Sequence, residues 1–177
     1  MTMFSPYSIV QTSAYPDQEV SWESVPSPDL TSILGYKWKG IRELSHIANT
    51  ATGDLRTSTY TLTCTDFKFV GLPPVISGIH LTLSVQRSGR IVDQVIQITH
   101  GGVAIGDNRT SHFTDYDGNL IIMNNSVVGG ISDMWGAVLT PEVISDPSFG
   151  VILQFQSHPS YPHSSAVTLD YVGLTVF

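Results

Sequence analysis

The residues that could carry out chemistry in this 177-residue chain are few and lie far apart. The segment from Asp115 to Asn119 offers oxygen ligands that would suit calcium. Its glycine, Gly118, comes too early for a calcium-binding loop, and no glutamate follows at the required distance. An Asp-Gly hairpin turn is therefore the preferred interpretation, with a calcium site as the alternative.

The histidines do not form a recognisable metal motif. His158 and His163 lie in a Pro-rich loop, but a zinc site takes three or four protein ligands and no cysteine or acid is near them in sequence. The remaining histidines also lack metal-ligand spacing; they are His46, His80, His100 and His112. We therefore expect no metal site, and we interpret the two loop histidines as polar loop or interface contacts.

No arrangement of residues predicts an enzyme. The single cysteine, Cys64, lies in the strand-like run "TYTLTCTDFKF" and is expected to pack as a small hydrophobic side chain. The chain has no Gly-x-Ser-x-Gly nucleophile motif, no phosphate-binding loop and no local acid–base pair. We therefore expect neither catalysis nor a cofactor.

The composition narrows the possible partners. Charged residues make up 13% of the chain, and its net charge is −7 with only eight Lys and Arg. This balance argues against nucleic-acid binding, which needs a basic patch, and no apolar run approaches the ~20 residues of a membrane helix. The first residues also lack the features of a signal peptide. A surface of uncharged polar residues suits contact with other proteins, and an acidic balance favours either solubility or docking on a basic protein surface.

Strand periodicity dominates the sequence. In "GIHLTLSVQ" the residues Ile79, Leu81, Leu83 and Val85 alternate with polar ones, which predicts a half-buried antiparallel strand. Similar runs follow at 92–99, 151–156 and 166–177. In the last run the apolar residues change phase near Tyr171, which predicts either a β-bulge or burial on both faces.

Turns and short helices separate these runs. Gly- and Pro-containing turns recur at short intervals, which is typical of a β-sandwich or jelly roll. One single-turn helix is predicted after Thr140, which can cap it with Pro141 at the first helical position. A second is possible at 27–34. The sequence thus predicts an all-β antiparallel sandwich, jelly-roll-like, over residues 20–177.

Residues 1–19 differ from the rest because they lack clear alternation. Such a segment is expected to form an extended N-terminal arm. Either a neighbouring subunit or the chain's own sandwich would hold it in place. Its aromatic residues Phe4, Tyr7 and Tyr15 are candidate partner contacts.

Two tryptophans raise the question of sugar binding. Trp135, next to Gly136, could stack on a sugar ring, but a buried core anchor is preferred because large aromatic residues are usually buried. Trp38 stands between Lys37 and Lys39 and is expected to be an exposed partner contact.

Four stretches, taken in order, resemble a domain common in structural proteins of tailed phages and prophages. They are "FKFVGLPPVISGIHLTLSVQR", "VDQVIQITHGGVAIGDNR", "SDMWGAVLTPEVISDPSFGV" and "VTLDYVGLTVF". The resemblance extends from about Val20 to Phe177. The chain departs from the pattern at Leu72-Pro73-Pro74 and in a long insert at 33–59, which affects the loops more than the fold.

The resemblance implies a jelly-roll protein of the virion without catalytic residues. Trp135 and Phe149 would then anchor the core, and we expect Phe67 and Phe69 there as well. The leading hypothesis is a capsid cement or decoration protein, made in the host cytoplasm and bound to the major capsid protein at the capsid surface, as a homotrimer. The alternative is a tail, baseplate or fibre module that binds a host receptor or glycan.

Overall fold

The computed structural model describes residues 3–4, 6, 8–12, 59, 61–88, 91–110, 122–157 and 166–177. Within these residues it contains nine strands and one short helix. In chain order they are β1 (Met3–Phe4), β2 (Ser8–Thr12), β3 (Thr61–Thr65), β4 (Ile79–Ser88), β5 (Ile91–His100), β6 (Val103–Ile105), β7 (Ile122–Gly129), α1 (Pro141–Ser145), β8 (Gly150–Ser157) and β9 (Ala166–Val176).

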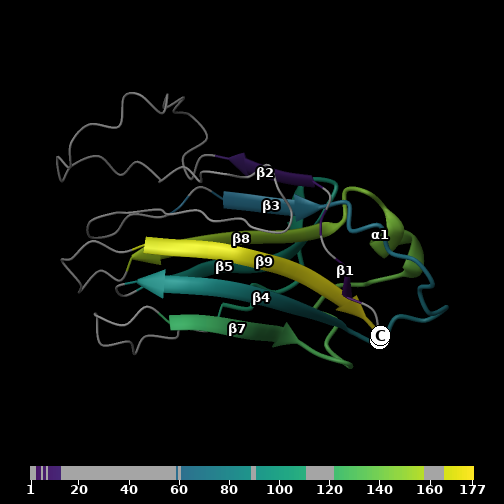
Figure 1. Ribbon diagram of the computed structural model, residues 1–177. Coiled ribbons are helices and arrows are strands. Elements are labelled where there is room, and N and C mark those ends of the chain that lie inside the picture. Colours follow the sequence, from purple (N-terminus) through teal and green to yellow (C-terminus); the bar gives the residue numbers. More distant parts are fainter. Residues whose placement is uncertain are drawn as a thin grey trace.

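The strands form two antiparallel sheets that pack face to face (Figure 1). One sheet has the order β1-β9-β4-β7 and the other the order β2-β3-β8-β5-β6. If the edge strand β2 is left out and the remaining eight strands are numbered from 1 to 8 along the chain, one sheet has the order 1-8-3-6 and the other has the order 2-7-4-5. This interleaved order is that of a jelly roll, so the predicted fold class is confirmed.

The core lies between the two sheets. Strand β4 buries Ile79, Leu81, Leu83 and Val85, the four residues that alternation placed on one face. Strand β8 contributes a second set of fully buried side chains from the opposite sheet; these are Val151, Leu153 and Phe155. The alternation in the sequence therefore reports directly which side of each strand faces the other layer.

The phase change in the last run has both of the expected causes. Ser84 pairs with Tyr171 and Val85 pairs with Leu169, so Asp170 is an extra residue in β9. Beyond this bulge the four consecutive residues 172–175 are all buried. The C-terminal half of β9 is therefore covered on both faces.

Strand β3 ends earlier than the sequence predicts. Its pattern suggested a strand that continues through Phe67 and Phe69, but the strand stops at Thr65. Asp66 and Lys68 adopt left-handed backbone angles, with φ of 59° and 51°, which an extended strand cannot contain. The two phenylalanines therefore reach the core from a loop.

The described part of the predicted arm belongs to the sandwich itself. Strand β1 pairs with β9, and β2 pairs with β3. The ring of Phe4 packs edge-on against that of Phe69, with centroids 4.9 Å apart. These residues thus follow the alternative in which the chain's own sandwich holds the segment. The boundary at residue 20 and the possible helix at 27–34 lie outside the described residues.

The predicted helix after Thr140 is present as α1. The Thr140 hydroxyl accepts a hydrogen bond from the backbone N–H of Val143 at 3.3 Å, and Pro141 begins the helix. Ile144 anchors the helix in the core, and Asp146 ends it in extended conformation before Pro147. This turn links β7 to β8 at one end of the sandwich.

Candidate binding surface

The only cysteine of the chain is fully buried in β3. Burial removes the Cys64 thiol from water and raises its pKa to about 12, so the thiolate is suppressed at neutral pH. Cys64 therefore acts as core packing, as its surroundings in the sequence suggested.

We expect Cys64 in the folded protein to resist a water-soluble thiol reagent at pH 8, because reaction requires an accessible thiolate. Labelling should become complete within minutes in unfolding concentrations of guanidinium. A colorimetric disulfide reagent would measure both rates. Fast reaction without denaturant would contradict the burial of this thiol.

A serine, a histidine and an aspartate meet beside α1 but do not form a nucleophile–base pair. The hydroxyl of Ser148 donates to Asp146 Oδ1 at 2.6 Å, and His100 Nε2 lies 3.6 Å from Asp146 Oδ2. The carboxylate therefore lies between the other two groups, whereas catalysis would need the hydroxyl to donate to the imidazole. The Ser148 hydroxyl also accepts from the backbone N–H of Gly101 at 3.0 Å, which ties the β5–β6 turn to this loop.

These contacts predict a pH dependence. Hydrogen bonds from the Ser148 hydroxyl and backbone N–H, and then the neighbouring His100, lower the pKa of Asp146 below its ordinary 3.8. Because the folded-state pKa is lowered, the stabilisation is present above pH 3.8 and is lost as the pH falls through the folded-state pKa. The difference in Tm between the wild type and Asp146→Asn should be constant at neutral pH and shrink in acid. Thermal unfolding of both proteins across a pH series measures this difference in Tm. A difference that stays the same from neutral to acidic pH would refute the prediction.

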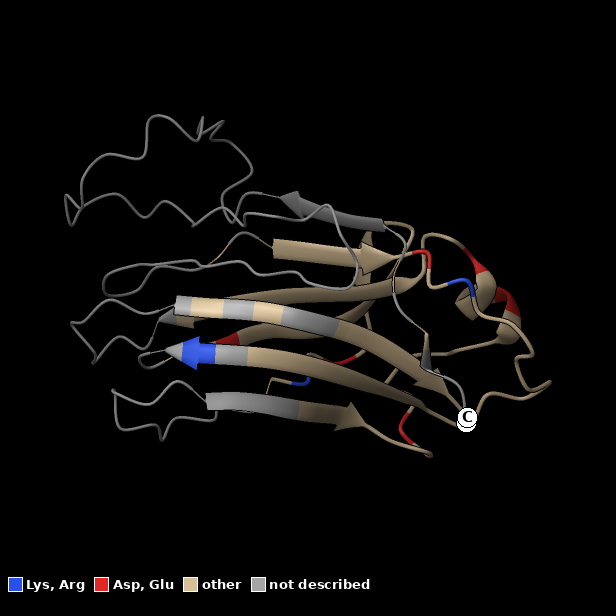
Figure 2. Cartoon of the chain, in the orientation of Figure 1, with Lys and Arg blue, Asp and Glu red and all other residues tan. Residues whose placement is uncertain are grey.

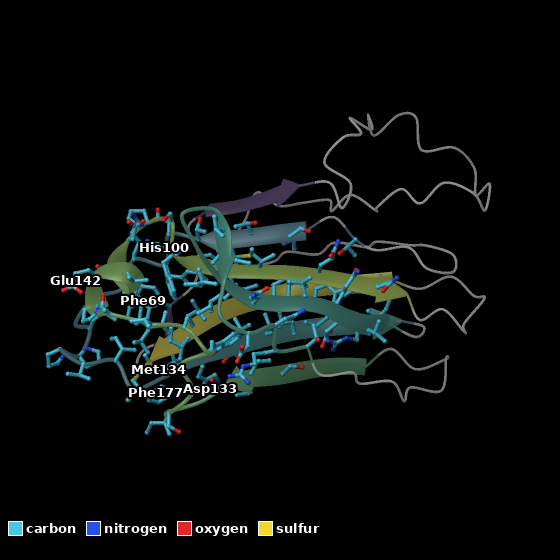
Figure 3. All side chains as sticks on the ribbon, turned by 180° about the vertical axis from the view of Figure 1, so that it is seen from behind. Phe69, His100, Asp133, Met134, Glu142 and Phe177 are labelled. Carbon is cyan, nitrogen blue, oxygen red and sulfur yellow. The ribbon has the colours of Figure 1, made fainter. Side chains whose placement is uncertain are left out.

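One end of the sandwich is built from three neighbouring segments, which we call the loop end. It comprises residues 66–78 between β3 and β4, residues 101–103 at the β5–β6 turn, and residues 130–149 between β7 and β8 (Figure 1). The last residue, Phe177, lies at the same end. Figure 3 shows the side chains of Phe69, Met134 and Phe177 at this end of the sandwich, together with His100 at the end of β5.

Trp135 fixes the longest of these segments to the core. Its side chain is fully buried, and its ring N–H donates to the carbonyl of Ile79 at 3.0 Å. Its backbone has the left-handed φ of 56°, which is rare for a bulky residue. The carboxylate of Asp133 accepts from the Trp135 N–H at 2.8 Å and helps to hold this conformation.

Arg109 and Asp107 attach a further loop to the same place. Arg109 donates to Asp133 at 2.8 Å, and the backbone N–H of Asp107 donates to the carbonyl of Trp135 at 2.6 Å. Gly136 has φ of +68°, and a Cβ there would lie 2.7 Å from the Asp107 carboxylate. The left-handed backbone angle favours a glycine at this position, and a side chain there would also displace the Asp107 carboxylate.

Backbone hydrogen bonds join the loop end to the C-terminus. Ser77 donates to the carbonyl of Phe177 at 2.7 Å, and Phe177 donates to that of Gly78 at 3.0 Å. The N–H of Ile79 donates to the carbonyl of Asp133 at 2.9 Å. The loops at this end are thus ordered by one another as well as by the strands that they connect.

The loop end also carries most of the exposed large apolar side chains of the described residues. Five of the six lie in its segments; these are Val70, Val75, Val103, Ile131 and Val138. The sixth, Val127, is on β7. Exposed apolar groups gathered on ordered loops are a common feature of protein-binding surfaces.

The opposite end of β4 contains a buried ion pair that sequence reasoning missed. Arg87 on β4 donates at 2.6 Å to Asp93 on β5, a strand of the other sheet, and its guanidinium carbon lies 5.8 Å from the ring centroid of Phe155. The two side chains are only 8% and 5% exposed. The pair joins a strand of one sheet to a strand of the other and is not accessible to a ligand.

The residues that the sequence suggested as core anchors or partner contacts fall into two groups in the structure. Trp135, Phe67 and Phe149 are buried in the core, Phe69 is partly buried against it, and Phe4 contacts Phe69. The other candidates lie outside the described residues; they are Tyr7, Tyr15, Trp38, the calcium-like segment 115–119, His158 and His163.

Three structural and comparative findings bear on the class of protein. The described residues contain no group of three His, Cys, Asp or Glu able to hold a metal ion. No described helix has the length and hydropathy to cross a membrane. Comparison of the chain with protein-family models, with curated proteins and with solved structures gives no match. The strand order defines the class of this chain as a jelly-roll sandwich.

Proposed function

We propose that this chain is a structural protein of a tailed-phage virion that binds and stabilises the major capsid protein lattice as a cement or decoration protein. One observation carries the proposal. The residues that give "SDMWGAVLTPEVISDPSFGV" its resemblance to phage structural proteins each have a structural role in a jelly roll, a fold common among capsid proteins.

Those roles come from the geometry of the loop end. Asp133 holds the backbone of Trp135, and Trp135 is buried beneath the loop. Thr140 caps α1 and Phe149 is fully buried. Gly150 leaves no room for a side chain, because a Cβ would meet the carbonyl of Cys64. The residues of this motif therefore order the loop. An ordered, exposed loop supports a role in binding other proteins.

In this proposal the protein acts at the capsid surface as a homotrimer, since several weak contacts made together give a tight attachment. The competing proposal is a tail or fibre module that stacks a glycan on an aromatic residue. The burial of Trp135 removes that residue as a stacking platform. The tail proposal therefore depends on Trp38, which lies outside the described residues.

The number of copies per particle tests the proposal. Quantitative gels of purified virions should give a copy number comparable to that of the major capsid protein. Particles assembled without this protein should lose DNA at a lower temperature and regain heat resistance when the full chain is added back. A handful of copies per virion would instead favour the tail module, and absence from virions would refute both.

A further inference from the structure

We propose that the loop end is the face by which this protein docks, and that its partner is a protein surface with an apolar centre and a border of Lys and Arg. The identity of that partner as the outer surface of the capsid shell rests on the proposed function. The exposed apolar side chains and the charge of the loop end indicate the chemistry of the partner.

The apolar side chains of this surface are largely exposed to solvent. Val138, Val75 and Val70 are 86%, 76% and 73% exposed, and Ile131 is 66% exposed. They belong to two segments that meet, because a Cβ at Gly78 would contact the backbone of Ile131. A partner that covers these side chains would remove apolar surface from contact with water, and this hydrophobic effect is the main favourable term in protein association.

The surface is also fixed in shape before binding. Trp135 and the Ser77–Phe177 hydrogen bond hold its two longer segments, and the Gly101–Ser148 hydrogen bond holds the turn that carries Val103. A surface that is already ordered loses little conformational entropy when it binds. Exposed valines on such ordered loops are therefore suited to binding.

Charge indicates which partner the surface fits. Segments 66–78 and 130–149 contain four acidic residues and one Lys, a net charge of −3. Lys68 lies 2.7 Å from Asp66 and Arg109 lies 2.8 Å from Asp133, so Glu142 and Asp146 carry the negative charge that these two ion pairs do not offset. Figure 2 shows the acidic positions in red on α1 and the adjoining loops. A hydrogen bond from Thr140, followed by one from the backbone N–H of Glu142, lowers the pKa of Glu142, and its carboxylate is ionised at neutral pH as that of an exposed Glu ordinarily is.

This charge argues against the other occupants of an apolar surface. Two copies of the chain meeting through their loop ends would bring like charges together, which is unfavourable. A nucleic acid and an anionic membrane would be repelled for the same reason. A basic protein surface is the one that gains from both the valines and the acids.

The test measures binding of the full chain to capsids that lack it, by co-sedimentation across a range of protein concentrations. Val75→Ser with Val138→Ser should weaken binding by roughly tenfold or more, because two exposed valines no longer contribute apolar contact. The control is Val127→Ser, which changes a valine on β7 that is 60% exposed and lies outside the loop end, and it should bind as the wild type does. Circular dichroism and Tm should be unchanged in both variants.

A second variant tests the charge. Glu142→Lys should weaken binding, and raising the salt concentration should narrow its difference from the wild type, because salt screens exposed charges. The Glu142→Gln variant should bind more weakly than the wild type and more tightly than Glu142→Lys.

The outcomes separate this inference from the proposed function. If the wild type binds capsids and the double serine variant binds equally well, the loop end is not the docking face and the inference is overturned. If the double variant disrupts self-association of the chain and leaves capsid binding intact, the occupant is a second copy and the inference is again overturned. If the wild type is absent from virions and does not bind capsids, the proposed function fails first.

Discussion

Replacing Trp135 by alanine should lower the free energy of unfolding by about 3–5 kcal/mol, the range for removing a large aromatic side chain from a core. The residue is fully buried, and its ring N–H donates to the carbonyl of Ile79. Loss of the ring leaves a cavity under the loop end and releases a backbone held at φ of 56°. Urea denaturation followed by circular dichroism measures the change without depending on tryptophan fluorescence.

Two further variants identify the cause. Trp135→Phe keeps most of the apolar volume but loses the ring N–H, and the Ile79 carbonyl still accepts from Gly130 at 3.0 Å. We therefore expect a smaller loss than for alanine. Val138→Ala, three residues away and exposed, should change stability by no more than about 0.5 kcal/mol. A loss of less than about 1 kcal/mol for Trp135→Ala would show that the tryptophan does not anchor the loop.

The second large effect is expected at the buried ion pair. Arg87→Met should lower the free energy of unfolding by about 3–5 kcal/mol, because it leaves the carboxylate of Asp93 buried without its cation. The contact of the guanidinium with the ring of Phe155 is lost in the same variant. Thermal and urea unfolding at neutral pH would measure the loss.

The double variant Arg87→Met with Asp93→Leu should recover much of that stability. Replacing both members of a buried pair by apolar side chains is often neutral, whereas removing one member is costly. A double-mutant cycle isolates this coupling. If the two single losses simply add, the two side chains are not energetically coupled, and the ion pair does not explain how this end of the sandwich is stabilised.

The sequence predicted the strands and the core more fully than it predicted their arrangement. Alternation over 79–86 and 151–156 identified which residues face inward, because side chains on a strand point to opposite sides in turn. Thr140 and Pro141 located the helix, since capping depends on a few adjacent residues. These features are local, and local patterns are sufficient to recognise them.

The missed features depend on residues that are distant in the chain. Nothing near Arg109 indicates that it bonds to Asp133, twenty-four residues away. The early end of β3 follows from left-handed angles at Asp66 and Lys68, residues whose types do not demand them. The ion pair of Arg87 and Asp93 joins strands of different sheets, and the only available signal was that Arg87 begins the "RSGR" turn and Asp93 follows it. The loop end itself emerges only when three separate segments are brought together.

The interleaved strand order has a consequence for how the chain is held together. Strands β8 and β9 each lie between two strands from earlier in the chain, β8 between β3 and β5 and β9 between β1 and β4. A protease that cuts once within residues 130–149 would therefore leave two fragments interlocked through both sheets. Such a nicked protein would migrate as two bands on a denaturing gel while remaining a single particle in solution, and neither fragment would have a complete sheet of its own.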